Sequence, residues 1–188
     1  MTGRAMQQTH RLIWGAAAGV TLTSVLVLLL ARRPGPNLIQ NGGYEEGLKS
    51  WGRYVHRSHG ARAEFHAENV RGANGRVAKI SATQPALYDS VEFSQGSIAV
   101  QAGHKYRLSF RARSTVRQPI RVQIIPNAPP WTFYGFRVST EIIPRWKVYR
   151  FTGRTMLTGD DGKVMFQFGG VMGDIWIDDV VFQDQGEG

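Results

Sequence analysis

Period-two alternation of apolar and polar residues is the pattern that most constrains how this chain can fold. Between Lys105 and Arg113, apolar residues occupy every second position, and segments 120–124 and 164–168 repeat the arrangement. Successive side chains of a strand point to opposite faces, so this spacing predicts strands with one buried and one solvated face. No stretch after Ala31 has the 3.6-residue period of an amphipathic helix.

Glycine, proline and asparagine clusters separate these segments from further strand-like ones. The other predicted strands are 77–82, 97–101, 136–142, 146–152 and 174–182. Many short strands with turn residues at fairly regular intervals are typical of a β-sandwich or barrel. The sequence therefore predicts an all-β domain over residues 37–184, with 185–188 as a tail.

The amino-terminal part has a different character, because residues 12–31 carry no charge and lie between Arg11 and Arg32. Twenty helical residues span about 30 Å, the thickness of the hydrocarbon core of a bilayer. A cleavable signal peptide is the alternative, but its apolar region is shorter, and Leu29 stands where its cleavage site needs a small residue. We therefore predict a retained signal anchor, with residues 1–11 as a cytoplasmic tail, 12–31 as one transmembrane helix and 32–36 as a linker.

Small residues recur on one face of this predicted helix at Gly15, Gly19 and Thr23. Such a GxxxG face allows a second helix to approach closely within a membrane. The alternative is that glycine is simply common in membrane helices, and the sequence leaves both interpretations open.

Charge and cysteine content exclude several classes of function. The formal net charge is +9, but Arg4, Arg11, Arg32 and Arg33 account for four of the 23 basic residues. Beyond residue 33 the chain therefore has 19 basic and 14 acidic side chains, a scattered excess of +5 that accompanies no nucleic-acid-binding motif. The chain has no cysteine, which excludes disulfides, thiolate metal sites and cysteine nucleophiles.

Four motifs in order give the predicted domain a family resemblance. Residues 37–47 read Asn-Leu-Ile-Gln-Asn-Gly-Gly-Tyr-Glu-Glu-Gly, 72–81 form a glycine-flanked strand, 102–110 read Ala-Gly-His-Lys-Tyr-Arg-Leu-Ser-Phe, and 177–180 read Ile-Asp-Asp-Val. This set resembles the carbohydrate-binding modules grouped as families four, nine and twenty-two. The resemblance implies a jelly-roll β-sandwich, which here follows a single transmembrane α-helix.

The resemblance also implies a structural calcium ion near the first and last strands. The matching positions are Glu45 and Asp178 or Asp179, although Gly43 replaces an aspartate of the family pattern. Carboxylate and backbone oxygens suit Ca²⁺, which would clamp together a domain without disulfides. The alternative is that these acids are ordinary turn and strand-end residues.

Aromatic residues near prolines are the candidates for ligand binding. Trp131, Phe133 and Tyr134 follow Pro129-Pro130, and Tyr88 lies beside Asp89. Sugar rings stack on flat aromatic side chains while their hydroxyls need polar partners, so these four residues form a candidate glycan site. Trp51, Trp146 and Trp176 lie in strand-like context and are predicted to be core residues.

The chain contains no nucleophile elbow and no phosphate-binding glycine loop, so we predict a non-catalytic protein. The first hypothesis is a membrane-anchored, extracytoplasmic binding module whose ligand is a glycan. The alternative is an accessory subunit of a larger integral-membrane complex, respiratory, photosynthetic or secretory, that binds protein partners. Either way we expect a single-pass protein of the bacterial inner membrane with its carboxyl-terminal domain in the periplasm.

Overall fold

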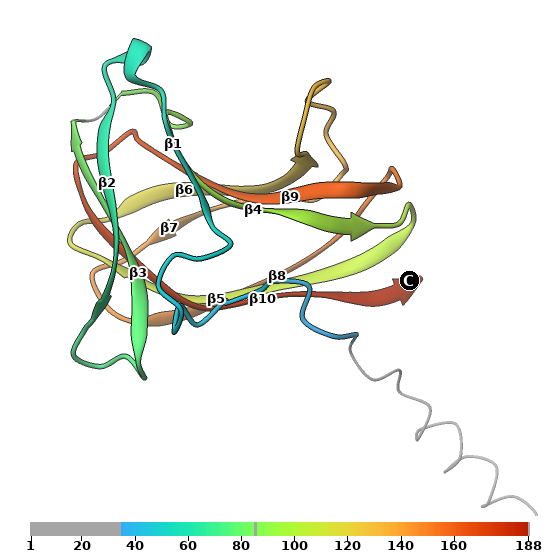
Figure 1. Cartoon of the computed structure of the whole chain (residues 1–188), viewed down its shortest axis with the longest axis horizontal. Helices are drawn as coiled ribbons and strands as arrows, with labels where there is room; N and C mark the ends of the chain where they lie inside the picture. Colours follow the sequence, from blue (N-terminus) through green and yellow to red (C-terminus); the bar gives the residue numbers. More distant parts are fainter. Residues whose placement is uncertain (1–34, 85, 188) are drawn as a thin grey trace, which may run out of the picture. The chain divides into compact units, whose positions relative to one another are not determined.

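The computed structural model describes residues 35–84 and 86–187, which form two five-stranded antiparallel sheets packed face to face (Figure 1). Sheet I has the strand order β1 (Gly52–Val55), β4 (Val91–Val100), β9 (Gly159–Phe168), β6 (Gln118–Pro126) and β7 (Arg137–Ile142). Sheet II has the order β2 (Arg62–Asn69), β3 (Arg76–Gln84), β10 (Gly173–Glu187), β5 (His104–Ser114) and β8 (Lys147–Arg154). A single 3-10 turn, η1 (Arg57–His59), joins β1 to β2. The predicted all-β sandwich is confirmed.

The core lies between the sheets and is built from the inward positions of the alternating strands. In β5 these positions include Tyr106, Leu108 and Phe110, none more than 1% exposed. Aromatic rings contribute much of the contact, as where Phe110 meets Phe166 of the facing sheet edge-on at a centroid distance of 5.2 Å. Hydrophobic burial of this kind is the main favourable term in folding.

The three tryptophans that the sequence assigns to the core divide between two environments. Trp51 is 4% exposed and stacks on Phe93 inside the sandwich, as predicted. Trp176 alternates with core residues of β10, so it lies on the outer face of sheet II, where its indole is 4.3 Å from the Arg113 guanidinium. Trp146 lies 4.7 Å from Arg111 on that face. The alternating pattern does not distinguish these two environments, because neighbouring cations can cover an indole that lies outside the core.

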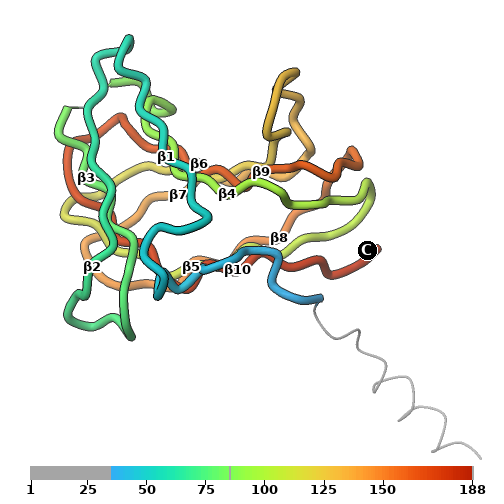
Figure 2. The backbone as a smooth tube through the Cα atoms, viewed as in Figure 1, coloured from blue at the N-terminus to red at the C-terminus, as the bar shows by residue number. Residues whose placement is uncertain are grey.

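The opening and closing sequence motifs pack against each other. The first described residues run beside β10 (Figure 2), where the Leu38 amide donates to the Phe182 carbonyl at 2.8 Å. The Asn37 side chain accepts a hydrogen bond from the Phe182 amide and donates to the Val180 carbonyl. Gly35, in the predicted linker, already donates to Asp184, and β10 continues to Glu187 through the predicted tail.

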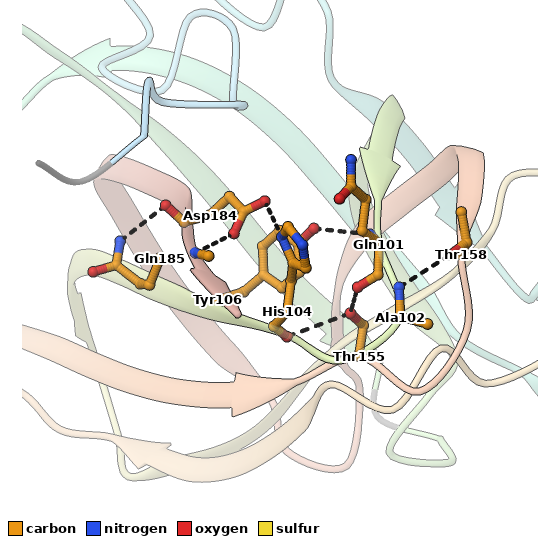
Figure 3. A network of polar contacts seen from close by, with 9 residues as sticks. Gln101, Ala102, His104, Tyr106, Thr155, Thr158, Asp184 and Gln185 are labelled. Atoms are coloured by element: carbon orange, nitrogen blue, oxygen red, sulfur yellow. Dashed lines mark hydrogen bonds and ion pairs between the residues drawn. The ribbon is translucent and has the colours of Figure 1, made fainter. Parts of the chain in front are cut away.

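At one end of the sandwich, a polar network joins two connections to the last strand (Figure 3). The Tyr106 hydroxyl accepts from the Gln101 amide at 2.9 Å, and Thr155 donates to the Gln101 carbonyl at 2.5 Å. On β10, Asp184 pairs with His104 at 2.8 Å. These contacts fix the β4–β5 and β8–β9 connections to the last strand.

The predicted cytoplasmic tail, the transmembrane helix and its packing residues Gly15, Gly19 and Thr23 lie outside the described residues. Within 35–84 and 86–187, no helix is long and apolar enough to cross a membrane.

Candidate functional site

The outer face of sheet I carries polar side chains because its strands alternate. In β6, Val122 and Ile124 point into the core, so Arg121 and Gln123 point away from it. Phe166 and Phe168 likewise place Gln167 of β9 on the outer face. Loops rise from this face at both ends of the sheet, the β6–β7 loop at one end and the β1–β2 and β3–β4 connections at the other (Figure 1).

Four of these outward side chains form a row across the strands that we call the polar ladder: Glu92, Gln167, Gln123 and Arg137. The Arg137 Nε donates to Gln123 Oε1 at 2.8 Å, and Gln123 Nε2 donates to Gln167 Oε1 at 3.2 Å. Gln167 Nε2 donates in turn to Glu92 Oε1 at 3.4 Å. His56 ends the row, with its Nε2 3.6 Å from the same Glu92 oxygen.

The ladder combines burial with spare hydrogen-bonding capacity. Gln123 is 7% and Gln167 5% exposed, although both lie on an outer face. Within the described chain, each of these amides uses one N–H group in a hydrogen bond, so the second remains available. A buried N–H group without a hydrogen-bond partner destabilises the fold. These amides are therefore suited to bind a polar ligand.

Aromatic rings flank the ladder on both sides along the strand direction. Trp131 and Phe133 of the β6–β7 loop lie over Lys163 and Arg137, respectively, and Trp131 is 57% exposed. On the other side Tyr88 is 49% exposed, and its hydroxyl accepts from Arg121 at 2.7 Å. Three of the four predicted ligand-binding residues thus border one polar strip.

Tyr134, the fourth, is a correction. Its side chain is 9% exposed and belongs to the hydrophobic core, where the ring lies against Gly159 and Gly162. Both glycines leave the space that this ring fills, so the loop turns Tyr134 inward and Trp131 outward. Tyr134 therefore offers no stacking face to a ligand.

A shallow hollow of about 170 Å³ opens beside Tyr88, and its walls include Arg121, Ser139 and Gln167. This volume is below the few hundred cubic ångströms usual for an enclosed small-molecule site. The face thus suits a ligand that lies along an open surface.

The sequence does not predict the polar ladder. The alternation in 120–124 and 164–168 does place Gln123 and Gln167 on a solvated face, which is the available signal. However, the hydrogen bond between them depends on the β6–β9 register, which pairs Gln123 with Met165 and Arg121 with Gln167. No local pattern encodes that register.

The predicted metal ligands lie at the seam between the opening loop and β10. Asp178 is 1% exposed, and its Oδ2 has no hydrogen-bond partner among residues 35–84 and 86–187. Burial raises the pKa of Asp178 from the usual 3.8 to about 6, and the charges of Asp179 and Glu45 act in the same direction while Arg111 opposes them. No group of three His, Asp or Glu side chains in that part of the chain is placed to hold a metal. An orphaned carboxylate oxygen nevertheless fits a hard cation that takes its other ligands from backbone oxygens.

Comparison with known proteins identifies solved structures that share this fold. The sequence matches no protein-family model, and no curated protein matches it. A solved family 4 carbohydrate-binding module is 26% identical, with a TM-score of 0.67 over 78% of this chain and 99% of that one. The domain has the jelly-roll fold of carbohydrate-binding modules.

Two other solved structures share the fold of the module at lower identity. The N-terminal cellulose-binding domain of β-1,4-glucanase C from Cellulomonas fimi is 18% identical, with a TM-score of 0.58 over 79% of this chain and 97% of that domain. A family 61 module in complex with β-1,4-galactotriose is 19% identical, with a TM-score of 0.57 over 79% and 98% of the two chains. These likenesses establish the fold alone.

Proposed function

We propose that the domain binds a glycan without catalysis, and that the outer face of sheet I is the binding surface. The observation that carries the proposal is the polar ladder of half-satisfied, buried amides between exposed aromatic rings. Sugars present apolar C–H faces and hydroxyls together, and this face offers Trp131 and Tyr88 for the first and Gln123 and Gln167 for the second. Among solved structures of the same fold are a cellulose-binding domain and a module in complex with β-1,4-galactotriose, which supports this class of ligand.

Substitution on this face tests the proposal. Full-length protein carrying Trp131→Ala or Gln123→Ala is expected to bind its glycan roughly tenfold more weakly, because one variant loses a stacking ring and the other a buried hydrogen-bonding amide. The measurement is titration calorimetry on a glycan selected from an array. Val148→Ala, an exposed apolar position on β8 of the other sheet, is the matched control and should leave affinity unchanged. Failure of the wild-type chain to bind any glycan of a broad array would refute the proposal.

The proposal includes a structural calcium ion held by Asp178 and Glu45, together with Asp179 or backbone oxygens. When bound, the ion would supply positive charge to the buried Oδ2 of Asp178, which has no hydrogen-bond partner in the described part of the chain. It would join the opening loop to β10 at the seam where Gly42 and Val180 already meet.

Stability without calcium should depend on pH through Asp178. Its folded pKa of about 6 exceeds the usual 3.8, so the protonated form stabilises the fold below 3.8 and that stability is lost as the pH rises through about 6. We expect a loss of about 1 to 2 kcal/mol after allowance for screening by water. Thermal melts in EDTA across this range should show the slope in the wild type and a flatter profile in Asp178→Asn.

Calcium should restore the stability that is lost at neutral pH in every variant that keeps Asp178. About 1 mM Ca²⁺ at neutral pH is expected to raise Tm by roughly 4 °C or more, and to do little for Asp178→Asn. Asp161→Asn, at an exposed position of β9, should respond like the wild type. Identical wild-type melts in calcium and in EDTA would exclude the ion.

The proposal includes a membrane anchor, which the uncharged segment 12–31 and its flanking arginines support. We propose a single-pass inner-membrane protein with the module in the periplasm, which protease accessibility in spheroplasts can check. The accessory-subunit alternative depends on the same segment, and no feature of residues 35–84 and 86–187 favours it.

A further inference from the structure

Three cations lie in or beside the polar ladder, and each lies over an aromatic ring. From charged group to ring centroid, the pairs are Arg121 with Tyr88 at 4.3 Å, Arg137 with Phe133 at 4.3 Å and Lys163 with Trp131 at 4.8 Å. They lie on β6, β7 and β9, so positive charge is spread over three of the four strands that the ladder crosses. A ring fixes the position of its cation without neutralising it.

Two acids of this face have partners, while Asp161 of β9 points outward two residues from Lys163 and forms no side-chain hydrogen bond or ion pair within the described chain. Glu92 accepts from Gln167 and lies 3.6 Å from His56, while Glu141 pairs with Arg117 at 3.3 Å. Among the residues that the structure describes, none of the three ring-bound cations forms an ion pair with a carboxylate. The charges of Arg121, Arg137 and Lys163 are therefore not taken up by ion pairs within the described chain and remain available to a ligand.

Arg121 shows this most clearly. One of its terminal nitrogens donates to the Tyr88 hydroxyl, while its Nε is buried and has no hydrogen-bond partner within the described chain. A guanidinium has five N–H groups in a planar fork that matches a carboxylate or sulfate. The group is thus held in place by a ring and still has donors to offer an anion.

We infer that the ligand is an acidic glycan, whose carboxylate or sulfate groups meet Arg121, Arg137 and Lys163 while its sugar rings lie along the ladder. The inference rests on the proposed function of this face and narrows the class of its ligand. A neutral glycan would satisfy the amides but leave three cations unpaired beneath it. An acidic one adds charge-assisted hydrogen bonds, which are about twice as strong as neutral ones.

Matched ligands that differ only in charge provide the test. Full-length protein, with the same neutral detergent in every arm, is titrated with polygalacturonate and with its fully methyl-esterified form, and with dextran sulfate and dextran. We expect at least one acidic polymer to bind tenfold or more tightly than its neutral match, an advantage that shrinks as NaCl rises from about 0.05 to about 0.5 M. The two pairs separate a carboxylate from a sulfate as the recognised group.

A double variant tests whether the outer face of sheet I causes the preference for the acidic polymer. Arg121→Gln with Lys163→Gln should abolish most of the preference for the acidic polymer, because neither residue belongs to the ladder that serves neutral hydroxyls. The matched control is Lys147→Gln with Arg150→Gln, which removes the same charge from β8 on sheet II. It should preserve the preference.

The possible failures are distinguishable. Equal binding of the acidic and neutral polymers overturns the inference and leaves glycan binding intact. Equal losses in the two double variants also overturn it, since they reveal a general effect of net charge. Absence of binding to every polymer, neutral or acidic, removes the proposed function together with the inference.

Discussion

A chain in which alanine replaces Gly42 is expected to lose about 3 to 4 kcal/mol of unfolding free energy. A Cβ atom at this position would lie 2.2 Å from the Val180 carbonyl oxygen, a distance that forces the backbone apart. The Gly42 carbonyl accepts the Val180 amide at 3.0 Å, and the Asn37 side chain donates to that same Val180 oxygen, so movement would break both contacts. Urea denaturation followed by tryptophan fluorescence measures the loss.

The neighbouring glycine is the control. Nothing lies within 4 Å of a Cβ atom built on Gly43, and its backbone does not require a positive φ. Gly43→Ala should therefore leave the unfolding free energy within about 0.5 kcal/mol of the wild type. Equal midpoints for the two variants would contradict the close packing of the opening loop on β10.

Gly42 and Gly43 show which structural features the family resemblance predicts and which it does not. The opening and closing motifs, 37–47 and 177–180, imply that the two chain ends meet, and the Gly42–Val180 contact realises this. What the motifs do not reveal is that one glycine of the pair is sterically required and the other is not. That difference arises from the bulge in β10 after Asp178, where Asp179 has a φ of 50°.

Strands were predictable where the inward face is uniformly apolar, as in β5, and missed where it is not. The inward positions of β2 include Ala63 and Ala67, whose small side chains contrast weakly with their polar neighbours. In β4, Gln95 takes a buried position by bonding to Gln40, and the bulge at Ser97 then shifts the period. The alternation consequently predicts a strand that begins at residue 97, whereas β4 begins at Val91.

The aromatic loop residues of the candidate site were predictable from the sequence, and the polar ladder was not. Dense aromatic residues after a double proline do indicate an exposed loop, and Trp131 lies there. The same density cannot tell which ring turns inward, because Tyr134 finds space beside Gly159 that lies 25 residues away in sequence. The polar ladder depends on the register between β6 and β9, which only the structure reveals.

Removal of the Trp51 indole is expected to cost about 4 kcal/mol of unfolding free energy. This side chain is 4% exposed, stacks on Phe93 at a centroid distance of 4.6 Å and lies 5.4 Å from Tyr44. Its Nε1 also donates to the Asn41 carbonyl at 3.2 Å, so it fastens the opening loop to sheet I. Chemical denaturation of Trp51→Ala, followed by circular dichroism, measures the cost of the cavity and the lost bond.

Trp131→Ala is the same chemical change at the surface, and it separates stability from binding. With 57% of its side chain exposed, Trp131 should contribute within about 0.5 kcal/mol to folding while its loss weakens glycan binding. Trp51→Ala should show the reverse, with glycan affinity retained at temperatures where it is still folded, because Trp51 lies beneath sheet I and cannot touch a ligand on its outer face. Matching stability losses in the two variants would mean that the β6–β7 loop is part of the core, and the outer face of sheet I would then lack its stacking platform.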